Sequence, residues 1–227
     1  MIKLEHVVLA SPEQMEFIIE GMRNPMNSWE KSDSGYGCDS GLCSGPCAFS
    51  PQWCGNTPRY VLGENDYTLM QKLSKAGTDH RKYMRMMPVY VRITAPLYWW
   101  KEFDTYKVGT VGNSCSTMHK IAEKEFTLED FSHEHILDNN GLWGIVYELN
   151  EWRTKYFETK DKKYWWQMIQ LLPSSYNQTR NVMMNYEVLA NIYKSRKNHK
   201  LDEWRELCKW IESLPYSELV IGGMINA

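Results

Sequence analysis

The sequence predicts an α+β protein with a modest sheet and long helices. Three observations support this prediction. Residues 89–94 alternate apolar and polar side chains, as a strand with one buried face does. Beyond Asn140, apolar residues recur at helical spacing over most of the remaining chain. Near the amino end, Ser11 and Pro12 followed by Gln14 form the signature of a helix start.

The first half of the chain contains short elements around one irregular segment. After the start at Ser11, the apolar residues of 15–22 line one helical face. Residues 31–58 are rich in Cys, Gly, Ser and Pro and lack periodicity, which predicts an irregular insertion. Asn65 is a plausible N-cap for a helix that ends at Gly77, and a second short helix is expected over 79–87.

After the strand at 89–94, Pro96 can open a helix through Phe103, and Gly109 and Gly112 interrupt the chain. Thr127 is expected to cap another short helix. Further helices are predicted over residues 142–157, 162–172, 178–196 and 201–214. We interpret residues 1–227 as a single domain that carries the insertion at about 31–58.

Composition excludes several classes of protein. The net charge of −2 argues against general electrostatic binding of nucleic acid. No run approaches the roughly 20 apolar residues of a membrane span. The first ten residues contain Glu5 and His6 and do not read as a secretory signal, so a cytoplasmic location is expected.

Polar residues in the C-terminal half form an array that suits a ligand groove. Asn185, Asn191 and Arg196 fall at spacings that can place two amides and a guanidinium along one wall, followed by His199. The alternative is a solvated helix surface, which spacing alone would favour.

The run LLPSSYNQTRNVMMNYEVLANIYKSRKNHKLDEW (171–204) resembles the C-terminal segment of flavin-dependent thymidylate synthases. The run VRITAPLYWWKEFDTYKVGTVGNSCSTMHKI (91–121) is similar to that family's strand, Ala-Pro and helix before its signature motif. The resemblance implies a twisted, largely antiparallel sheet flanked by long helices, and a homotetramer that holds flavin and nucleotide at subunit junctions.

The resemblance also implies roles for individual residues. Arg196 matches the family's catalytic arginine, which contacts the uracil of dUMP and favours ionisation of its N3. Flavin-binding positions correspond to Lys107, Asn185, Asn191, His199 and, near a family hydroxyl residue, His80. Substrate-binding positions correspond to Glu102, Thr105, Asn113, Cys115, Thr117 and again Arg196.

The signature motif departs from the family. Its pattern is Arg-His-Arg, two residues, Ser, one residue, Asn-Glu, one residue, Ser, one residue and Arg-Tyr. Thr105 and Thr117 stand where the family has arginines, Asn113 removes an acid, and Lys107 keeps one cation as a point charge. Either the site is rebuilt for the same nucleotide, or the scaffold holds another ligand or catalyses nothing. Rebuilding would draw on other cations, Lys101, Lys107, Arg180 or Lys194.

Four cysteines, Cys38, Cys43, Cys47 and Cys54, lie in the insertion and can be read as zinc or iron–sulfur ligands or as free thiols. Their spacing lacks a Cys-x-x-Cys pair. His133-Glu134-His135 has no evident third ligand and reads as a surface loop.

The function that the resemblance implies is reductive methylation of dUMP to dTMP. Methylenetetrahydrofolate supplies the carbon, and FAD reduced by NADPH supplies the hydride. The alternatives are a nucleotide- or flavin-binding phage accessory protein without synthase activity, and a flavin enzyme acting on another pyrimidine nucleotide.

Overall fold

The computed structural model describes residues 1–38 and 58–222. The first half contains β1 (Lys3–Leu9), α1 (Pro12–Arg23), β2 (Gly35–Cys38), β3 (Pro58–Val61), α3 (Glu64–Lys75), α4 (Lys82–Met86), β4 (Pro88–Pro96) and α5 (Leu97–Phe103). The second half contains β5 (Val111–Ser114), α6 (Thr117–Lys120), α7 (Asn140–Thr159), α8 (Lys162–Leu171), β6 (Asn177–Asn185), α9 (Tyr186–Arg196), α10 (Asp202–Glu212) and α11 (Glu218–Ile221). Short 3-10 turns occur at Asn24–Met26, Trp29–Lys31 and Leu128–Asp130.

The main sheet is antiparallel and has the strand order β1-β4-β6-β5. Its centre is the pairing of β4 with β6, in which Val91 lies opposite Val182. The strand predicted at residues 89–94 is therefore confirmed as the middle of β4, and its alternate residues, Val89, Val91 and Ile93, are buried. The predicted α+β class, with helices around an antiparallel sheet, is confirmed.

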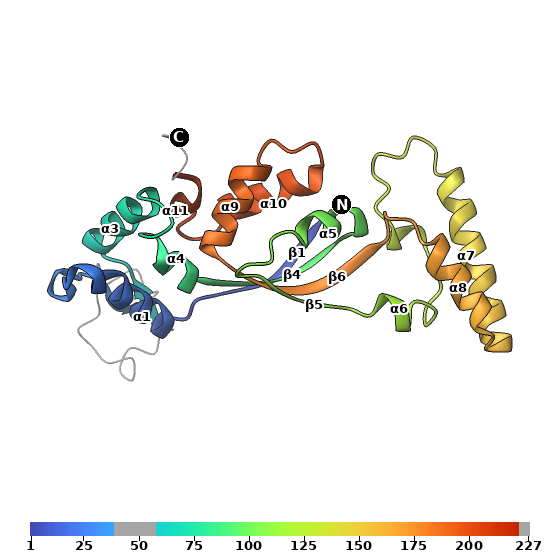
Figure 1. Ribbon diagram of the computed structural model, residues 1–227, viewed down its shortest axis with the longest axis horizontal. Coiled ribbons are helices and arrows are strands. Elements are labelled where there is room, and N and C mark those ends of the chain that lie inside the picture. Colours follow the sequence, from blue (N-terminus) through green and yellow to red (C-terminus); the bar gives the residue numbers. More distant parts are fainter. Residues whose placement is uncertain (39–57, 223–227) are drawn as a thin grey trace.

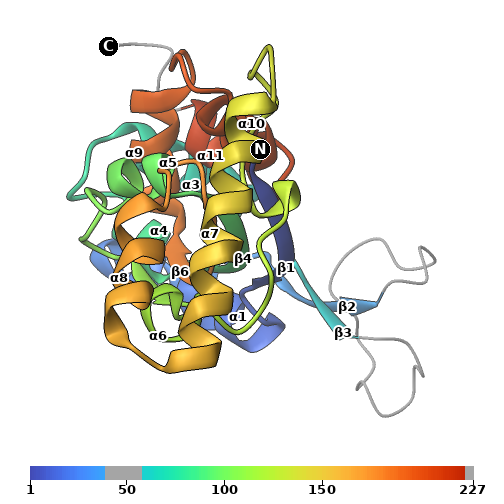
Figure 2. The ribbon, with the colours of Figure 1, turned by 90° about the vertical axis from the view of Figure 1, so that its right-hand side faces the viewer.

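The helices are distributed unevenly around this sheet. Figure 1 shows α5, α9 and α10 on one side of the long strands, α1, α3 and α4 at one end, and the α7–α8 pair at the other. Figure 2 shows β2 and β3 projecting from the body as a separate ribbon. On the side away from α9, the large side chains of Val8, Tyr90 and Val111 are exposed.

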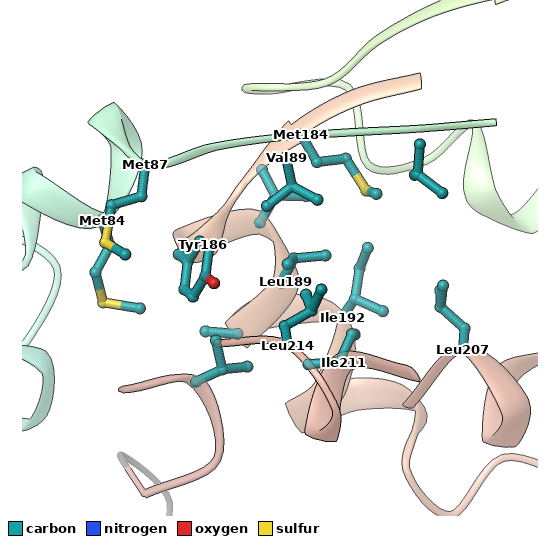
Figure 3. Close-up of a cluster of buried hydrophobic side chains, with 14 of the residues drawn as sticks. Met84, Met87, Val89, Met184, Tyr186, Leu189, Ile192, Leu207, Ile211 and Leu214 are labelled. Carbon is teal, nitrogen blue, oxygen red and sulfur yellow. The ribbon is translucent and has the colours of Figure 1, made fainter. Parts of the chain in front are cut away.

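The core forms two clusters of buried hydrophobic residues. The larger one packs α9, α10 and α11 against β4 and β6, and Figure 3 shows Leu189 and Ile192 of α9 between the sheet and Ile211. A smaller cluster lies around α7 and α8 and includes Leu149 and Met168. Among the described residues, no helix combines the length and apolar character needed to cross a bilayer.

The helix predicted over residues 178–196 is wrong in its first half. Residues Asn177–Asn185 form β6, and the helix begins only at Tyr186. In β6, Gln178, Val182 and Met184 are buried, and their neighbours are less buried. A short apolar run can fit the period of a strand or of a helix, so the sequence pattern alone did not identify the strand. Pairing with β4 and β5 satisfies the backbone of this segment and decides the outcome.

Several local predictions are confirmed. Ser11 and Gln14 form a reciprocal capping box with Pro at the first turn of α1. A capping box also forms at Thr127, although the turn that follows it is 3-10. The predicted cap at Asn65 is wrong by two residues, because Gly63 is the N-cap and α3 begins at Glu64. The strands β1, β2, β3 and β5 were not predicted.

Candidate functional site

The C-terminal end of α5 places two carboxylates against two arginines from distant parts of the chain. Arg196 Nη1 donates to Glu102 Oε2 at 2.7 Å, and Arg180 Nη1 donates to Asp104 Oδ1 at 2.7 Å. The first ion pair joins the end of α5 to α9, and the second joins it to β6. An anionic ligand that reaches either arginine therefore meets a guanidinium that is already oriented.

Arg196 is held on several sides. Its Nε donates to the Tyr106 hydroxyl at 3.0 Å, and its guanidinium carbon lies 4.6 Å from the centre of the Trp204 ring. The Trp204 indole N–H donates to Glu102 Oε2 at 2.9 Å, so Glu102 binds the arginine and the ring beneath it. Trp204 is fully buried against Trp99, which anchors the arrangement in the core.

Arg180 is held in a similar way on the adjoining strand. Its guanidinium carbon lies 4.1 Å from the centre of the Trp100 ring, a cation–π distance. Its Nε donates to Gln178 Oε1 at 2.9 Å, and Gln178 Nε2 donates to Thr117 Oγ1 at 2.9 Å. Stacking and hydrogen bonding together restrict this side chain to one orientation.

A cavity of about 180 Å³ lies beside Arg180. Its lining combines aromatic rings, two cations and a hydroxyl, and consists of Trp100, Phe103, Asp104, Tyr106, Lys107, Thr110, Gly112, Arg180 and Val182. Tyr106 belongs both to this lining and to the contacts of Arg196. The cavity therefore adjoins, through one phenol ring, the group formed by Arg196, Glu102, Tyr106 and Trp204, called the Arg196 cluster below.

Gly109 fixes the course of the segment that encloses this cavity. Its φ of +76° is a left-handed conformation that favours glycine. A Cβ there would lie 2.9 Å from Asn185 Nδ2 and 3.1 Å from Val188 Cγ2. The segment between α5 and β5 thus packs closely against the first turn of α9, which a larger residue would prevent.

The predicted flavin-binding residues do not form one cluster in a single chain. Asn185 is buried, and its Oδ1 caps α9 by accepting from the Val188 N–H at 3.0 Å. Asn191 and Lys107 are exposed, and Lys107 lines the cavity. His199 Nδ1 accepts from the Leu201 N–H at 3.2 Å, while its Nε2 lies 3.5 Å from Glu102.

His80 is an exposed residue just before α4, and no contact joins it to the Arg196 cluster within the described residues. The Asn185 cap also changes the predicted helical array. Asn185 precedes the helix, and Leu189, four residues later, is fully buried in the core. Of the residues in that array, only Arg196 and His199 contact Glu102 and so belong to or adjoin the Arg196 cluster.

The predicted substrate-binding residues are also spread out. Thr105 Oγ1 donates to the Glu102 carbonyl at 2.7 Å and so closes the end of α5. Asn113 is exposed on β5, and Cys115 lines a different cavity, of about 440 Å³. Thr117 Oγ1 accepts from Gln178 Nε2 at 2.9 Å, so both threonine hydroxyls take part in internal hydrogen bonds at positions where the resemblance places arginines.

Several residues of the site were not singled out from the sequence. Asp104, Tyr106, Trp100 and Trp204 take part through contacts across 76 to 102 positions of sequence separation or through shared cavity walls. Their residue types alone gave no signal. Arg180 was named only as one of several cations that could replace the missing arginines.

The metal-binding interpretation of the insertion falls mostly outside the described residues. Cys43, Cys47 and Cys54 lie there, and of Cys38 only the backbone in β2 is described. Within the described ranges, no group of three or more His, Cys, Asp and Glu could hold a metal ion. His133 and His135 bond instead to the Phe131 carbonyl and to Asp202.

The two cysteines with described side chains should differ in reactivity. Cys115 is exposed, whereas burial raises the pKa of Cys208 to about 11. Because the thiolate is the reactive form, iodoacetamide at mildly alkaline pH is expected to modify Cys115 and spare Cys208 in the folded protein. Peptide mapping by mass spectrometry measures both sites, with urea-unfolded protein as the control. Equal modification of the two in folded protein would contradict the burial of Cys208.

Comparison with known proteins gives a match in structure and none in sequence. No protein-family model matches the chain, and a search of curated proteins finds no significant match. Two crystal structures of ThyX, the flavin-dependent thymidylate synthase of Helicobacter pylori, each complexed with FAD and dUMP, are similar in fold. One has a TM-score of 0.64 over 96% of this chain and 95% of its own. The other has a TM-score of 0.66 over 99% and 98%, and both are 15% identical to this sequence. The protein thus shares the fold of the flavin-dependent thymidylate synthase ThyX over nearly its whole length.

Proposed function

We propose that this protein is a flavin-dependent thymidylate synthase-type enzyme that converts dUMP to dTMP. The observation that carries the proposal is the placement of Arg196 by Glu102, Tyr106 and Trp204 at the side of a cavity that holds two further cations. The shared fold, and the FAD and dUMP bound in those similar structures, support it. Methylenetetrahydrofolate and NADPH complete the proposed reaction as co-substrates.

In this proposal Arg196 acts on the pyrimidine. Its Nε and Nη1 are used by Tyr106 and Glu102, which leaves Nη2 as the donor toward a substrate. A charged donor facing a uracil carbonyl stabilises negative charge on the ring and favours loss of the N3 proton. The indole of Trp204 covers one face of the guanidinium and limits its exposure to water.

The residues present fit a flavin in part. Asn191, Lys107 and His199 retain exposed surface, whereas Asn185 is committed to its helix cap. The cavity that Lys107 lines, of about 180 Å³, is too small to enclose a dinucleotide, since ligand pockets usually span roughly 300–1,000 Å³. FAD supplies the hydride when bound, and this chain would hold its ring through Asn191, His199 and Lys107 beside a second copy.

The open face of the sheet supports assembly of several copies. Val8, Tyr90 and Val111 are between 45% and 62% exposed and lie around a shallow cavity of about 220 Å³. A strand face with this much exposed apolar surface is typical of a protein–protein interface. We propose a homotetramer in which neighbouring copies complete the flavin site, and a cytoplasmic location.

A second candidate function is nucleotide or flavin binding without turnover. The observation that favours it is the engagement of Thr105 and Thr117 in internal hydrogen bonds, at positions where the resemblance expects arginines. A phage accessory protein would be one setting for such a binder. A related alternative is a flavin enzyme acting on another pyrimidine nucleotide.

Flavin binding gives the first test of the proposal. Protein purified or reconstituted with FAD is expected to show the absorption bands of bound flavin, and Asn191→Ala should weaken FAD affinity. Asn198→Ala, which changes an exposed asparagine just beyond α9, is the matched control and should leave affinity unchanged. A protein that is colourless after incubation with FAD and removal of the unbound flavin would exclude the enzyme. Formation of dTMP by the wild type separates an enzyme from a simple binder.

A further inference from the structure

We propose that Arg180 and Lys107 bind the phosphate of the nucleotide in the cavity beside Trp100, and that Asp104 occupies Arg180 until the phosphate replaces it. This rests on the proposed function and assigns the anion-binding end of that site. The family signature would supply arginines at Thr105 and Thr117. Here Thr105 donates its hydroxyl proton to the Glu102 carbonyl, and Thr117, which accepts from Gln178, offers only a neutral hydroxyl. The charge must therefore come from elsewhere in the chain.

The lining of the cavity suits a phosphate. Arg180 and Lys107 both face it, and within the described residues Lys107 has no acidic partner. Arg180 uses Nε and Nη1 on Gln178 and Asp104, so its Nη2 group is left to donate. Thr110 also lines the cavity, and its hydroxyl oxygen is buried without a hydrogen-bond partner among the described residues. A fork of guanidinium donors, an ammonium and a hydroxyl match the acceptors of a phosphate.

The size and position of the cavity define what it holds. A volume of about 180 Å³ accommodates the phosphate end of a nucleotide and excludes a dinucleotide. The Tyr106 phenol forms part of the cavity wall, and its oxygen accepts from Arg196 Nε at 3.0 Å. A phosphate beside Arg180 thus places the rest of a mononucleotide along Tyr106 toward Arg196, the residue assigned to the pyrimidine.

Asp104 can leave Arg180 when a phosphate binds, because its side chain is far more exposed than that of Arg180. Its side chain is 55% exposed, whereas that of Arg180 is 18% exposed and fixed against Trp100. The carboxylate can therefore swing into solvent while the guanidinium stays in place. Because Asp104 and the phosphate compete for one guanidinium, Asp104 lowers nucleotide affinity and keeps the arginine oriented when the site is empty.

The experiment compares dUMP with deoxyuridine, which lacks only the phosphate, by isothermal titration calorimetry on the full chain. The wild type should bind dUMP more tightly than deoxyuridine. Arg180→Gln should weaken dUMP binding about tenfold to a hundredfold, the range of one charge-assisted contact, and leave deoxyuridine unchanged. Lys107→Gln should act in the same direction more weakly. Lys101→Gln removes the same charge from an exposed position of α5 outside the cavity and is the matched control.

Asp104→Asn gives a result that misfolding cannot imitate, because it should tighten dUMP binding several-fold without changing deoxyuridine binding. The proposal is overturned if dUMP binds no better than deoxyuridine, if neither ligand binds, or if Arg180→Gln weakens both equally. Failure of the synthase proposal is distinguished separately. An intact phosphate preference that depends on Arg180, in a protein that forms no dTMP with FAD and the co-substrates, would leave this site standing and remove the enzyme function.

Discussion

Arg196→Lys is expected to lower the rate of dTMP formation by about 100- to 1,000-fold, the range seen when one donor that stabilises developing charge is lost. Arg196 binds Glu102 and Tyr106 with two different nitrogens and stacks on Trp204. A lysine keeps the charge but has neither the planar fork nor the same stacking surface. Single-turnover assays with reduced FAD, following dTMP by chromatography, measure the effect.

Glu102→Gln separates positioning from charge at the same place. The glutamine oxygen can still accept from Arg196 and from Trp204, so the geometry of the cluster is retained while the carboxylate charge is lost. We expect a smaller loss of activity than for Arg196→Lys. If Arg196→Lys formed dTMP within a few-fold of the wild type, Arg196 would have no catalytic role.

Asp66→Asn is expected to destabilise the protein by about 3–5 kcal/mol, because it leaves a buried arginine without its counter-charge. Asp66 is fully buried, and it accepts from Arg23 Nε at 2.5 Å and from the hydroxyls of Ser32 and Ser34 at 2.7 and 2.6 Å. For a domain of this size the loss corresponds to a fall in Tm of roughly 6–20 °C. Urea unfolding followed by circular dichroism measures the free energy of unfolding.

The double variant Arg23→Met with Asp66→Leu serves as the control. It removes both charges and should recover part of the stability, because buried ion pairs are often replaceable by apolar residues. Recovery stays incomplete, since Ser32 and Ser34 lose their acceptor. A single Asp66→Asn variant as stable as the wild type would show that the pair contributes little.

The Asp66 carboxyl also links stability to pH. Burial raises its pKa, but hydrogen bonds from Ser34, Ser32 and Arg23 outweigh burial and bring the pKa below the ordinary value of 3.8. The folded state therefore binds this proton less readily than the unfolded state. The stabilisation is complete above the unfolded pKa and is lost as pH falls through the folded one. We expect Asp66→Asn to flatten the acid limb of the stability profile.

Short-range signals in the sequence predicted much of the local structure. The capping box at Ser11, the strand at 89–94 and the helices over 162–172 and 201–214 were each predicted from a pattern of residue types within a few positions of the chain. The error at 178–185 has the opposite cause. The residues of that segment have no strong local preference for helix or strand. Its strand conformation is decided by pairing with β4, about ninety positions earlier.

In the candidate site, too, residue identities were predictable from the sequence, whereas the contacts between distant residues were not. Arg196, Glu102, Lys107 and His199 were named from motif positions, but which of them meet was not predictable from spacing. The Arg196–Glu102 contact joins residues 94 apart, and the Arg180–Asp104 contact joins residues 76 apart. Asn185 shows the converse, since local chemistry made it a helix cap instead of the expected groove residue.

The sequence by itself determined the α+β class and the identities of the charged groups, because periodicity, capping and composition act along the chain. Only the tertiary structure decided that β6 is a strand and that Arg180 and Arg196 meet carboxylates at the end of α5. It also decided that a small cavity lies beside Arg180 and shares Tyr106 with the contacts of Arg196. The physical reason is that strand pairing and ion pairing between distant segments depend on how the helices pack on the sheet, and no local preference specifies that packing.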